Sequence, residues 1–473
     1  MIVHWHRRDL RPRDNLGLER AQSLDGPIVP VFVLDPTVLT HASSVRVASL
    51  LEALSALRSW YRERGSDLLV RRGEASEVIP AVTAETDAST VVWGEDYSGL
   101  AQERDRAVTA AVEDDGVGCE TVHDSICHEP GSITPNQGEF YSVYSYFWKK
   151  WRDREKQPPV DPPTGEELAD SDDFGGLDPG EIPSLSALGF DEPDASRPTV
   201  TPSAARERVA SFCADAIYRY ADERDYPAAG MTSRLSVHLK WGTVGVRELY
   251  AATERAAKRA ADSDAEHSVR EFQRQLAWRE FYAHVLSFNP ETVRENFSSY
   301  PNEIQWRTDP DGLEAWKAGK TGYPIVDAGM RQLREEAWMH NRVRMLVASF
   351  LTKDLLLDWR LGYDWFRERL ADHETANDVG GWQWAASTGT DAQPYFRVFN
   401  PMKQGREYDP DATYIRRYVP ELEGVEPETI HSWTDLGPAK RSRVAPEYPA
   451  PIVDHADRRT EAIETFERAR NAD

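Results

Sequence analysis

Short apolar runs alternate with amphipathic segments over the first 130 residues. The runs are rich in β-branched residues and predict strands at Ile2–His6, Ile28–Leu34, Leu68–Arg71, Thr90–Trp93 and Glu120–His123. Between them, the clearest amphipathic segment spans 45–64 and places its apolar residues at helical spacing. Because parallel neighbours need a crossover helix, this alternation predicts an α/β domain over residues 1–130, built on a doubly wound parallel sheet.

The pattern changes twice further along the chain. An aromatic stretch of helical character over 140–157 is followed by a segment rich in Pro, Asp and Gly up to about residue 202, which predicts a long surface linker. From Ala204 onward the spacing is helical almost throughout, and no convincing alternating strand follows. We therefore expect a connection and linker over 131–203 and an all-α domain over 204–473.

Composition places the chain among large globular proteins and limits the classes of molecule that it can bind. Its 473 residues are 40% hydrophobic and 29% charged, and 56 Lys and Arg stand against 80 Asp and Glu, giving a net charge of −24. This balance argues against a protein that binds polyanions over its whole surface, but it leaves room for one basic groove. The acidic excess and the scarcity of Lys indicate a surface adapted to concentrated salt.

The sequence lacks the residue patterns of several kinds of metal-binding, disulfide-bonded, membrane and catalytic protein. The three cysteines, Cys119, Cys127 and Cys213, form no metal-ligand spacing and no disulfide framework, so we predict no metal site and a reducing compartment. No apolar run approaches the length of a membrane span, and the amino terminus does not read as a signal peptide. These features predict a soluble, cytoplasmic protein without membrane contact. The sequence also lacks a P-loop, a Gly-x-Gly-x-x-Gly fingerprint and hydrolase motifs.

Two stretches combine aromatic or hydroxyl side chains with backbone donors. Residues 272–282 place Gln275, Trp278 and Tyr282 on one face of a predicted helix, which suits a flat, hydrogen-bonding ligand. A helix that packs its aromatics into the core carries about equal weight. The run Thr232–Ser236 offers hydroxyls and N–H groups ahead of a helix, an arrangement that can hold a phosphate but also caps ordinary helices.

A second predicted helix carries a polar, cationic and apolar mixture on one side: Trp338, Asn341, Arg342 and Met345. Arg344 faces elsewhere, and if buried it needs a carboxylate partner, which Asp372 or Glu374 can supply; a solvated helix face is the alternative. Further on, Gly380–Asp391 sets two Trp among Gly and small residues, where the backbone can approach a ligand. Stacking surfaces with a phosphate cradle point to a bound aromatic cofactor and leave a nucleobase substrate open.

These runs together resemble the photolyase/cryptochrome flavoproteins. The resemblance rests on Thr232–Ser236, Trp278–Tyr282, Lys320–Asp327, Trp338–Arg342, Gly381–Ala385 and the opening His6–Arg11 with Asp14 and Asn15. It covers nearly the whole chain and is closest to the class I cyclobutane pyrimidine dimer photolyases. It implies an α/β antenna domain, an all-α FAD-binding domain, and light-driven repair in which excited reduced flavin passes an electron to a pyrimidine dimer flipped out of DNA.

The resemblance also implies roles for individual residues. FAD would be held by Tyr220, Thr232, Ser233, Arg234, Leu235, Ser236, Phe272, Trp278, Asn341, Arg344, Asp372, His373, Glu374 and Asp378. The pyrimidine dimer and its DNA would be contacted by Arg224, Gln275, Trp278, Tyr282, Asn341, Arg342, Met345 and Trp384. Trp382, Trp359 and Trp306 would relay electrons between the flavin and the surface, with an Arg344–Asp372 pair beside the isoalloxazine and Asp378 near flavin N5.

Departures from the family pattern keep a second function open. Gln275 stands where class I dimer photolyases commonly have Glu, and Phe272 where the family often has Trp. Asp378 replaces an Asn that faces flavin N5, and a carboxyl there resembles plant cryptochromes. The alternative is therefore a cryptochrome-type blue-light photoreceptor without repair activity. Met345, Trp384 and the short segment after residue 455 favour repair.

The remaining expectations concern the antenna chromophore and the partners. The stretch Ser98–Asp105 lacks the Asn-Glu pair of folate-binding relatives, which favours 8-hydroxy-5-deazaflavin over methenyltetrahydrofolate; a vacant antenna site is the alternative. The partner implied is DNA containing pyrimidine dimers, approached by a cationic rim around Arg224 and Arg342. We expect a monomer with no obligatory protein partner.

Overall fold

The computed structural model describes residues 1–170 and 177–471. By its contacts the chain divides into two compact units. Unit 1 comprises Met1–Pro193, Pro198–Ala221 and Ser233–Pro290, and unit 2 comprises Asp194–Arg197, Asp222–Thr232 and Glu291–Asp473. Most of the helical segment between 202 and 290 thus belongs to the same unit as the amino-terminal strands. This division does not follow the domain boundaries expected at 130 and 203, which stay a prediction.

Unit 1 is built on the parallel sheet that the sequence predicts. Its strands are β1 (Ile2–His6), β2 (Ile28–Leu34), β3 (Leu69–Arg72), β4 (Thr90–Gly94) and β5 (Gly118–Val122), in the order β3-β2-β1-β4-β5. The first two strands have the predicted bounds, and the other three differ by one or two residues. The central strands are buried along their length, which explains why they read as continuous apolar runs.

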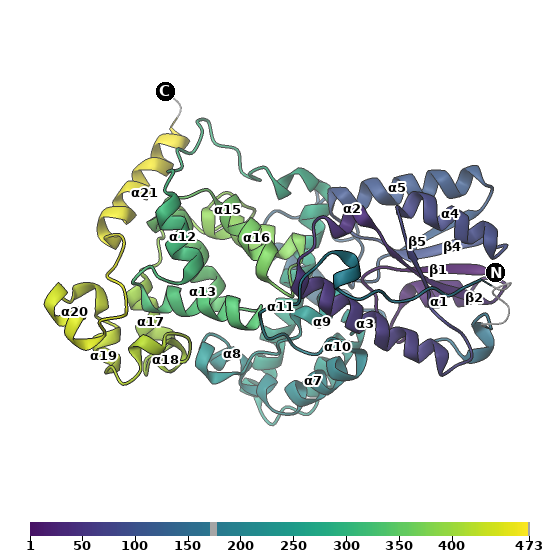
Figure 1. Ribbon diagram of the computed structural model, residues 1–473, viewed down its shortest axis with the longest axis horizontal. Coiled ribbons are helices and arrows are strands. Elements are labelled where there is room, and N and C mark those ends of the chain that lie inside the picture. Colours follow the sequence, from purple (N-terminus) through teal and green to yellow (C-terminus); the bar gives the residue numbers. More distant parts are fainter. Residues whose placement is uncertain (171–176, 472–473) are drawn as a thin grey trace. The chain divides into compact units, whose positions relative to one another are not determined.

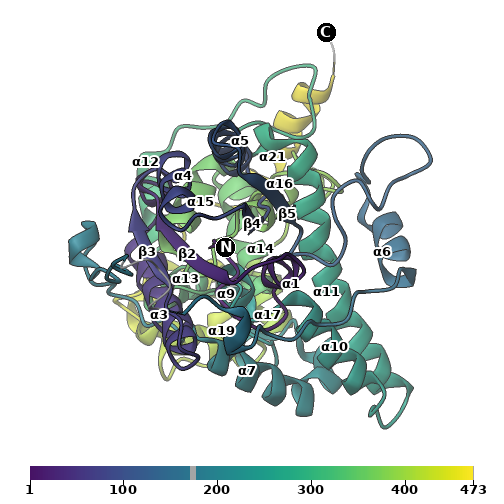
Figure 2. The ribbon, with the colours of Figure 1, turned by 90° about the vertical axis from the view of Figure 1, so that its right-hand side faces the viewer.

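Helices cover both faces of this sheet, as Figure 2 shows. On one face lie α1 (Leu16–Gln22) and α3 (Ser44–Arg62), and on the other lie α4 (Ala75–Glu85) and α5 (Gly99–Asp114). The short α2 (Pro36–Leu39) precedes α3, which realises the amphipathic segment predicted at 45–64. The strand order reverses between β1 and β4, and ligands of doubly wound sheets bind at the carboxyl ends of such a pair.

An irregular segment links the sheet to the later helices of unit 1. Its first helix, α6 (Tyr144–Asp153), is shorter than the helical stretch predicted over 140–157. The described part of the predicted linker contains the 3-10 turns η1 (Gly165–Glu167) and η3 (Ser186–Leu188), and its backbone bonds to the sheet, with Val70 N donating to Pro179 O at 2.8 Å. Residues 171–176 of this linker lie outside the described residues.

The later helices of unit 1 are α7 (Pro202–Ala214), η4 (Ala216–Arg219), α9 (Ser236–Trp241), α10 (Val246–Ala257) and α11 (Ser263–Phe288). A buried ion network fastens α10 to the sheet. Arg247 donates from Nε to Asp14 Oδ1 at 2.8 Å and from an η nitrogen to Asp124 Oδ1 at 2.7 Å. Arg11 donates to Asp124 Oδ2 at 2.8 Å. Because Asp14 and Asp124 follow β1 and β5, these long-range pairs join helices and strands that periodicity alone assigns to separate domains.

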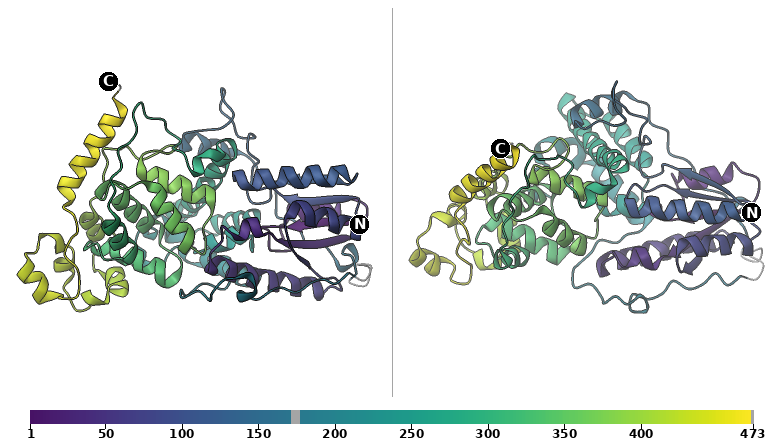
Figure 3. Two further views of the ribbon diagram at one scale, coloured as in Figure 1. Left: turned by 45° about the horizontal axis from the view of Figure 1, so that its top comes forward. Right: turned by 90° about the horizontal axis from the view of Figure 1, so that it is seen from above.

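Unit 2 is helical in its described part, as the sequence predicts. Its main helices are α12 (Pro310–Ala318), α13 (Pro324–Glu336), α14 (Asn341–Ser349), α15 (Trp359–Arg369), α16 (Thr375–Ala386), α17 (Pro401–Tyr408), α18 (Thr413–Tyr418), α19 (Pro427–Ile430), α20 (Pro438–Val444) and α21 (His455–Arg470), which Figures 1 and 3 draw from green to yellow. A π-helical turn, Phe350–Asp354, separates α14 from α15. Large aromatic residues, including Trp316, Trp359 and Trp382, are buried at the centre of this unit.

Shorter elements complete both units: α8 (Tyr220–Glu223), η5 (Pro227–Ala229), η6 (Pro290–Val293), η8 (Pro420–Leu422) and η9 (Trp433–Asp435). Among the residues that the structure describes, no helix has the length and apolar character needed to cross a bilayer.

One predicted helix begins later than its periodicity indicates. The sequence places Trp338 on a helical face with Asn341, Arg342 and Met345, but α14 starts at Asn341. Ala337 adopts a left-handed conformation, with φ of 48°, which ends α13, and the His340 side chain accepts from Arg342 N as the cap of the next helix. The interpretation of Trp338 as part of that face was therefore wrong.

Candidate functional site

The residues that the sequence singles out fall into one group in each unit. Unit 1 contains Tyr220, Ser233, Arg234, Leu235, Ser236, Phe272, Gln275, Trp278 and Tyr282. Unit 2 contains Arg224, Thr232, Trp306, Asn341, Arg342, Arg344, Met345, Trp359, Asp372, His373, Glu374, Asp378, Trp382 and Trp384. The geometry within each group is what the structure tests, whereas the ligand-binding roles stay predictions.

In unit 1, helix α11 brings together the face predicted from residue spacing. Gln275, Trp278 and Tyr282 are all partly exposed, and the rings of Trp278 and Tyr282 lie 5.5 Å apart. The sequence analysis missed the partner of this face. Tyr144 of α6 stacks on Trp278, with ring centroids 3.6 Å apart and planes at 12°. The aromatic stretch around Tyr144 was the available signal, but nothing local connects it to α11.

Tyr220 and Phe272 also meet within unit 1. Their rings lie 5.3 Å apart at a steep angle, and Phe212 of α7 packs against both. Both predicted residues are buried, so most of their surface is used in packing. This cluster joins α7, α8 and α11 and thereby fixes the start of the chain segment that leads to Ser233.

The turn before α9 concentrates positive charge. Arg234 has a left-handed backbone with φ of 51°, and Leu235 N donates to Ser233 Oγ at 3.4 Å. Arg208 of α7 donates to Ser233 O at 2.7 Å, and partial burial together with the nearby Arg234 lowers the pKa of its guanidinium. Two cations that disfavour one another, beside backbone and hydroxyl donors, fit a phosphate or pyrophosphate group. The donor set therefore agrees with the phosphate-binding role predicted for this turn.

The centre of the group in unit 2 is an arginine with two carboxylates. Arg344 donates to both carboxylate oxygens of Asp372, at 3.0 and 2.8 Å, so the expected pair forms. Its Nε donates to Met339 O at 2.9 Å. Asp378 Oδ2 lies 2.6 Å from His373 Nδ1, and its other oxygen lies 3.8 Å from Arg344. The four polar side chains thus form one partly buried network.

Glu374, the other candidate partner, accepts a hydrogen bond from Asn377 instead. Glu374 is buried together with its neighbours Asp372 and His373, at the chain segment that leads into α16. The sequence left the choice between Asp372 and Glu374 open, and side-chain geometry decides it in favour of Asp372.

Helix α14 presents the residues expected at a DNA surface. Asn341 is exposed, and its amide lies 3.8 Å from the sulfur of Met345. Arg342 pairs with Asp225 at 2.7 Å and lies 4.4 Å from the centre of the Tyr408 ring. Arg342 is therefore held in place by an acidic and an aromatic neighbour, and no local pattern in the sequence pairs either of them with it.

The three tryptophans of the predicted relay differ in burial. Trp382 and Trp359 lie in the same buried core of unit 2, whereas Trp306 is partly exposed and packs against it. Trp382 rests on Gly362, where any side chain would collide with the indole ring. A path from a buried ring to a partly exposed one is what electron exchange between an internal cofactor and the surface requires.

Trp384, two residues after Trp382 on α16, is partly exposed, and its ring lies 6.4 Å from that of Phe399. Two residues along a helix correspond to a rotation of about 200°, so the two side chains point to nearly opposite sides. Trp382 is buried in the core, whereas Trp384 is partly exposed to solvent. This separation agrees with the different roles that the resemblance implies.

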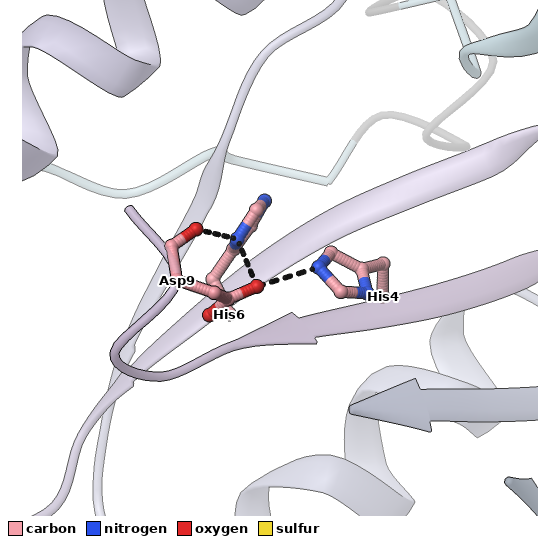
Figure 4. A group of neighbouring side chains, drawn as sticks. All are labelled: His4, His6 and Asp9. Atoms are coloured by element: carbon pink, nitrogen blue, oxygen red, sulfur yellow. Dashed lines mark hydrogen bonds and ion pairs between the residues drawn. The ribbon is translucent and has the colours of Figure 1, made fainter. Parts of the chain in front are cut away.

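A cluster that the sequence analysis missed lies at the end of β1, as Figure 4 shows. His4 Nε2 and His6 Nδ1 each lie 3.1 Å from Asp9 Oδ2, and the possible ligand atoms of these residues lie within 4.8 Å of one another. Alternation along a strand puts His4 and His6 on one side, which was the available signal. Asn15 also donates to Asp9 Oδ2, at 2.8 Å, so hydrogen bonds already satisfy this oxygen.

Burial and the hydrogen bonds of this cluster shift the pKa values of His4 and Asp9. Burial lowers the pKa of the His4 imidazole. Burial by itself would raise the pKa of Asp9, but His6 and His4 hold it well below its usual range. His6 Nε2 lies 2.7 Å from the Tyr61 hydroxyl, which ties the cluster to α3. His4 Nδ1 is buried and has no hydrogen-bond partner among the described residues. Because a neutral imidazole and an ionised carboxylate are the forms that bind metal ions, the three side chains are candidate metal ligands as well as hydrogen-bonded core residues.

Comparison with known families identifies the class of protein. Residues 2–164 match the DNA photolyase family, and residues 272–468 match the FAD binding domain of DNA photolyase. The chain therefore belongs to the DNA photolyase family and contains an FAD-binding domain. This confirms the resemblance inferred from the motifs, and with it the α/β and all-α character of the two halves.

The similarity to individual relatives extends over the whole chain. The deoxyribodipyrimidine photo-lyase of Halobacterium salinarum is 58% identical over 481 residues, which cover 99% of each chain. An archaeal photolyase from Sulfolobus tokodaii, solved with two FAD molecules, superposes with a TM-score of 0.83 at 30% identity and 99% coverage of both chains. A cryptochrome of Synechocystis gives a TM-score of 0.89 at 25% identity, covering 98% of this chain and 99% of its own.

Proposed function

We propose that this protein repairs DNA in light by splitting cyclobutane pyrimidine dimers, as a deoxyribodipyrimidine photolyase that uses FAD. The observation that carries the proposal is the 58% identity, over the full length of both chains, to the photo-lyase of Halobacterium salinarum. When bound and reduced, FAD supplies the light-excited electron that opens the cyclobutane ring.

Two features of this chain support FAD binding at the predicted residues. The Arg208 and Arg234 cations, with the Ser233 hydroxyl and the backbone N–H groups of the turn, offer donors to the pyrophosphate. Arg344, fixed by Asp372 and Met339 O, presents a guanidinium to the polar edge of the ring system. Asp378, held by His373, is the carboxyl that would lie beside flavin N5 when FAD is bound.

The dimer is bound by side chains that the fold leaves partly exposed. Trp278 and Trp384 stack against the flipped-out bases, while Gln275 and Asn341 offer amide groups to the base edges. Because an amide can both donate and accept, Gln275 retains hydrogen-bonding capacity where class I relatives have a carboxylate. Arg342 forms a cationic, phosphate-binding rim together with Arg224, and Tyr282 and Met345 contact the dimer or its DNA.

Electrons that reduce the cofactor enter through Trp306, Trp359 and Trp382. The contrast between the partly exposed Trp306 and the buried Trp359 and Trp382, together with the close packing of Trp382 on Gly362, supports this route. The Nε1 of Trp359 donates to Asn296 Oδ1 at 2.9 Å, which holds the middle ring in place.

An antenna chromophore is expected in the α/β part of unit 1, at the switch point between β1 and β4. Arg7 and Arg8 follow β1 there, and they pair with Asp105 and Asp96 at 2.6 and 3.1 Å. We favour 8-hydroxy-5-deazaflavin. The Sulfolobus tokodaii photolyase with two FAD molecules makes a second flavin the competing chromophore. An absorption spectrum of the purified protein distinguishes a deazaflavin band from additional flavin.

Illumination of the purified, reduced protein with an oligonucleotide that contains one pyrimidine dimer tests the proposal. We expect the dimer to disappear in blue light and to persist in the dark. Persistence in both conditions, with FAD bound, would remove the repair function. The same preparation reports the oligomeric state, for which we propose a monomer, and a DNA substrate favours a cytoplasmic location.

A blue-light photoreceptor is the second candidate, favoured by Asp378 and by the structural likeness to the Synechocystis cryptochrome. Dimer splitting by the wild type and by the variant D378N distinguishes the two functions. For a repair enzyme, this variant restores the residue usual among repair relatives and is expected to keep dimer splitting. Dimer splitting absent from both the wild type and D378N, together with a flavin spectrum that changes in light, would favour the receptor.

A further inference from the structure

Helix α6 concentrates positive charge in an acidic chain. Over residues 144–156 there are five cationic side chains and two acidic ones, whereas the whole chain carries a net charge of −24. Lys149 and Lys150 are adjacent and exposed, and neither pairs with a carboxylate in the part of the chain that the structure describes. Two adjacent exposed lysines that form no ion pair with a carboxylate are unusual on a surface where acidic groups are in excess.

The burial pattern of α6 orients these cations outward. Tyr144, Phe147 and Trp151, spaced three and four residues apart, are buried, and α6 lies beside α11 (Figure 2). Lys149 and Lys150 therefore lie on the other side, next to Tyr146, which is 57% exposed. The ammonium of Lys149 lies 5.8 Å from the centre of the Tyr146 ring.

Two contacts hold α6 rigidly next to the face of α11 that is predicted to bind the dimer. Tyr144 stacks on Trp278, and its hydroxyl donates to Arg274 O at 2.6 Å. At the other end of the helix, Lys156 donates to carbonyl groups of the last turn, including Arg154 O at 2.8 Å. Lys149 and Lys150 follow Tyr144 by five and six residues on α6, so they lie in the same part of unit 1 as Trp278.

We propose that the exposed face of α6, through Lys149 and Lys150, binds the sugar-phosphate backbone of the DNA that flanks the dimer. The inference rests on the proposed function and deepens it by adding a phosphate contact outside the dimer pocket. A chain with a strong negative charge repels DNA at long range, so it needs local cations at the contact surface. Phosphate contacts carry no sequence information, so this contact acts equally on damaged and undamaged DNA.

The salt dependence of DNA binding by the FAD-containing protein tests this inference. K149Q/K150Q is compared with the control K258Q/K440Q, in which an exposed lysine directly after α10 and an exposed lysine of α20 lose the same charge. If both contacts are lost, the slope of log K against log salt becomes shallower by about 1.8 for duplex DNA. The affinity then falls roughly 10- to 30-fold at about 0.15 M salt. Flavin absorbance reports at each salt concentration that the proteins remain folded.

Three results would overturn the inference while leaving the proposed function intact. One is a slope of K149Q/K150Q equal to that of the control, which would mean that only net charge matters. Another is an unchanged affinity at low salt. The third is a loss confined to dimer-containing DNA, because that would indicate an effect through Trp278 and not through phosphates. The proposed function fails separately, if the wild type itself does not split dimers in light.

Discussion

Each unit contains an arginine beside two aspartates, and the two hydrogen-bond networks differ in burial and in completeness. In unit 1, every nitrogen of the Arg247 guanidinium donates a hydrogen bond, to Asp14 and Asp124, and the side chain is 1% exposed. In unit 2, Arg344 is 19% exposed, and the nitrogen nearest Asp378 is 3.8 Å away, too far for a hydrogen bond. A complete network stabilises the fold, whereas one with unused donors is available to a ligand.

The largest expected effect comes from breaking the complete network. R247M leaves Asp14 and Asp124 buried beside fewer cations, which should lower the free energy of unfolding by about 3 to 5 kcal/mol. The control is R206M, whose exposed pair with Glu248 should contribute at most about 1 kcal/mol. Denaturant unfolding measures both. Similar losses for the two variants would contradict the structural role of the Arg247 network.

Glu280 is a further buried ionisable group, and it differs from the two arginine networks because backbone N–H groups are its hydrogen-bond donors. It accepts from Cys127 N at 2.7 Å and His128 N at 3.0 Å, and burial raises its pKa to about 7, from an ordinary value of 4.5. The folded state thus favours the protonated carboxyl, so stability should fall by about 3 kcal/mol as pH rises from 4.5 to 7.

The measurement is the free energy of unfolding of the wild type and E280Q across this pH range. E280Q cannot ionise, so the difference between the two proteins should change through the range and level off above about pH 7. E271Q, at a half-buried position on the same helix, is the control and should follow the wild type. A constant difference between E280Q and the wild type would show that Glu280 does not titrate there.

Removing the incomplete network should affect the ligand more than the fold. R344M is expected to weaken FAD binding by about 1.5 to 3 kcal/mol, the range for a hydrogen bond to a charged group. The free energy of unfolding of the FAD-free protein should change less than in R247M. Flavin fluorescence measures FAD affinity, with R294M as the control because its pair with Asp364 is exposed. Equal FAD affinity in R344M and R294M would refute the assignment of Arg344 to the FAD-binding site.

A substitution of Trp384, the partly exposed tryptophan of unit 2, tests the proposed dimer contact. W384A should weaken binding of dimer-containing DNA by about 1 to 3 kcal/mol, the value of one base stacked on an aromatic ring, and should leave FAD bound. Trp365 of α15 is also partly exposed, so W365A is a matched control. Titration of a labelled oligonucleotide measures both variants. Unchanged affinity in W384A would place the dimer elsewhere.

The smallest expected change concerns Trp382, the buried ring two residues before Trp384. W382F should slow photoreduction of oxidised flavin at least tenfold, or about 1.4 kcal/mol, with repair by previously reduced protein continuing. W316F changes a buried ring 6.0 Å from Trp382 and serves as the control. Absorbance during illumination follows the reduction. Equal slowing in both variants would mean that the electron path does not depend on Trp382 in particular.

The sequence determined those features that depend on neighbours within a few residues. β1 and β2 have their predicted bounds, because strands buried on both faces give uninterrupted apolar runs. Gln275, Trp278 and Tyr282 share a face because helical geometry fixes their spacing. The helix predicted to include Trp338 failed because a single left-handed residue, Ala337, is enough to end a helix.

Only the tertiary structure decided which distant residues meet. Nothing local in the sequence pairs Arg247 with Asp14, stacks Tyr144 on Trp278, or selects Asp372 over Glu374 as the partner of Arg344. Side-chain periodicity is set by the backbone and repeats every two or 3.6 residues, so a sequence displays it directly. Pairing across the chain depends instead on how whole elements pack, and many packings satisfy the same local pattern.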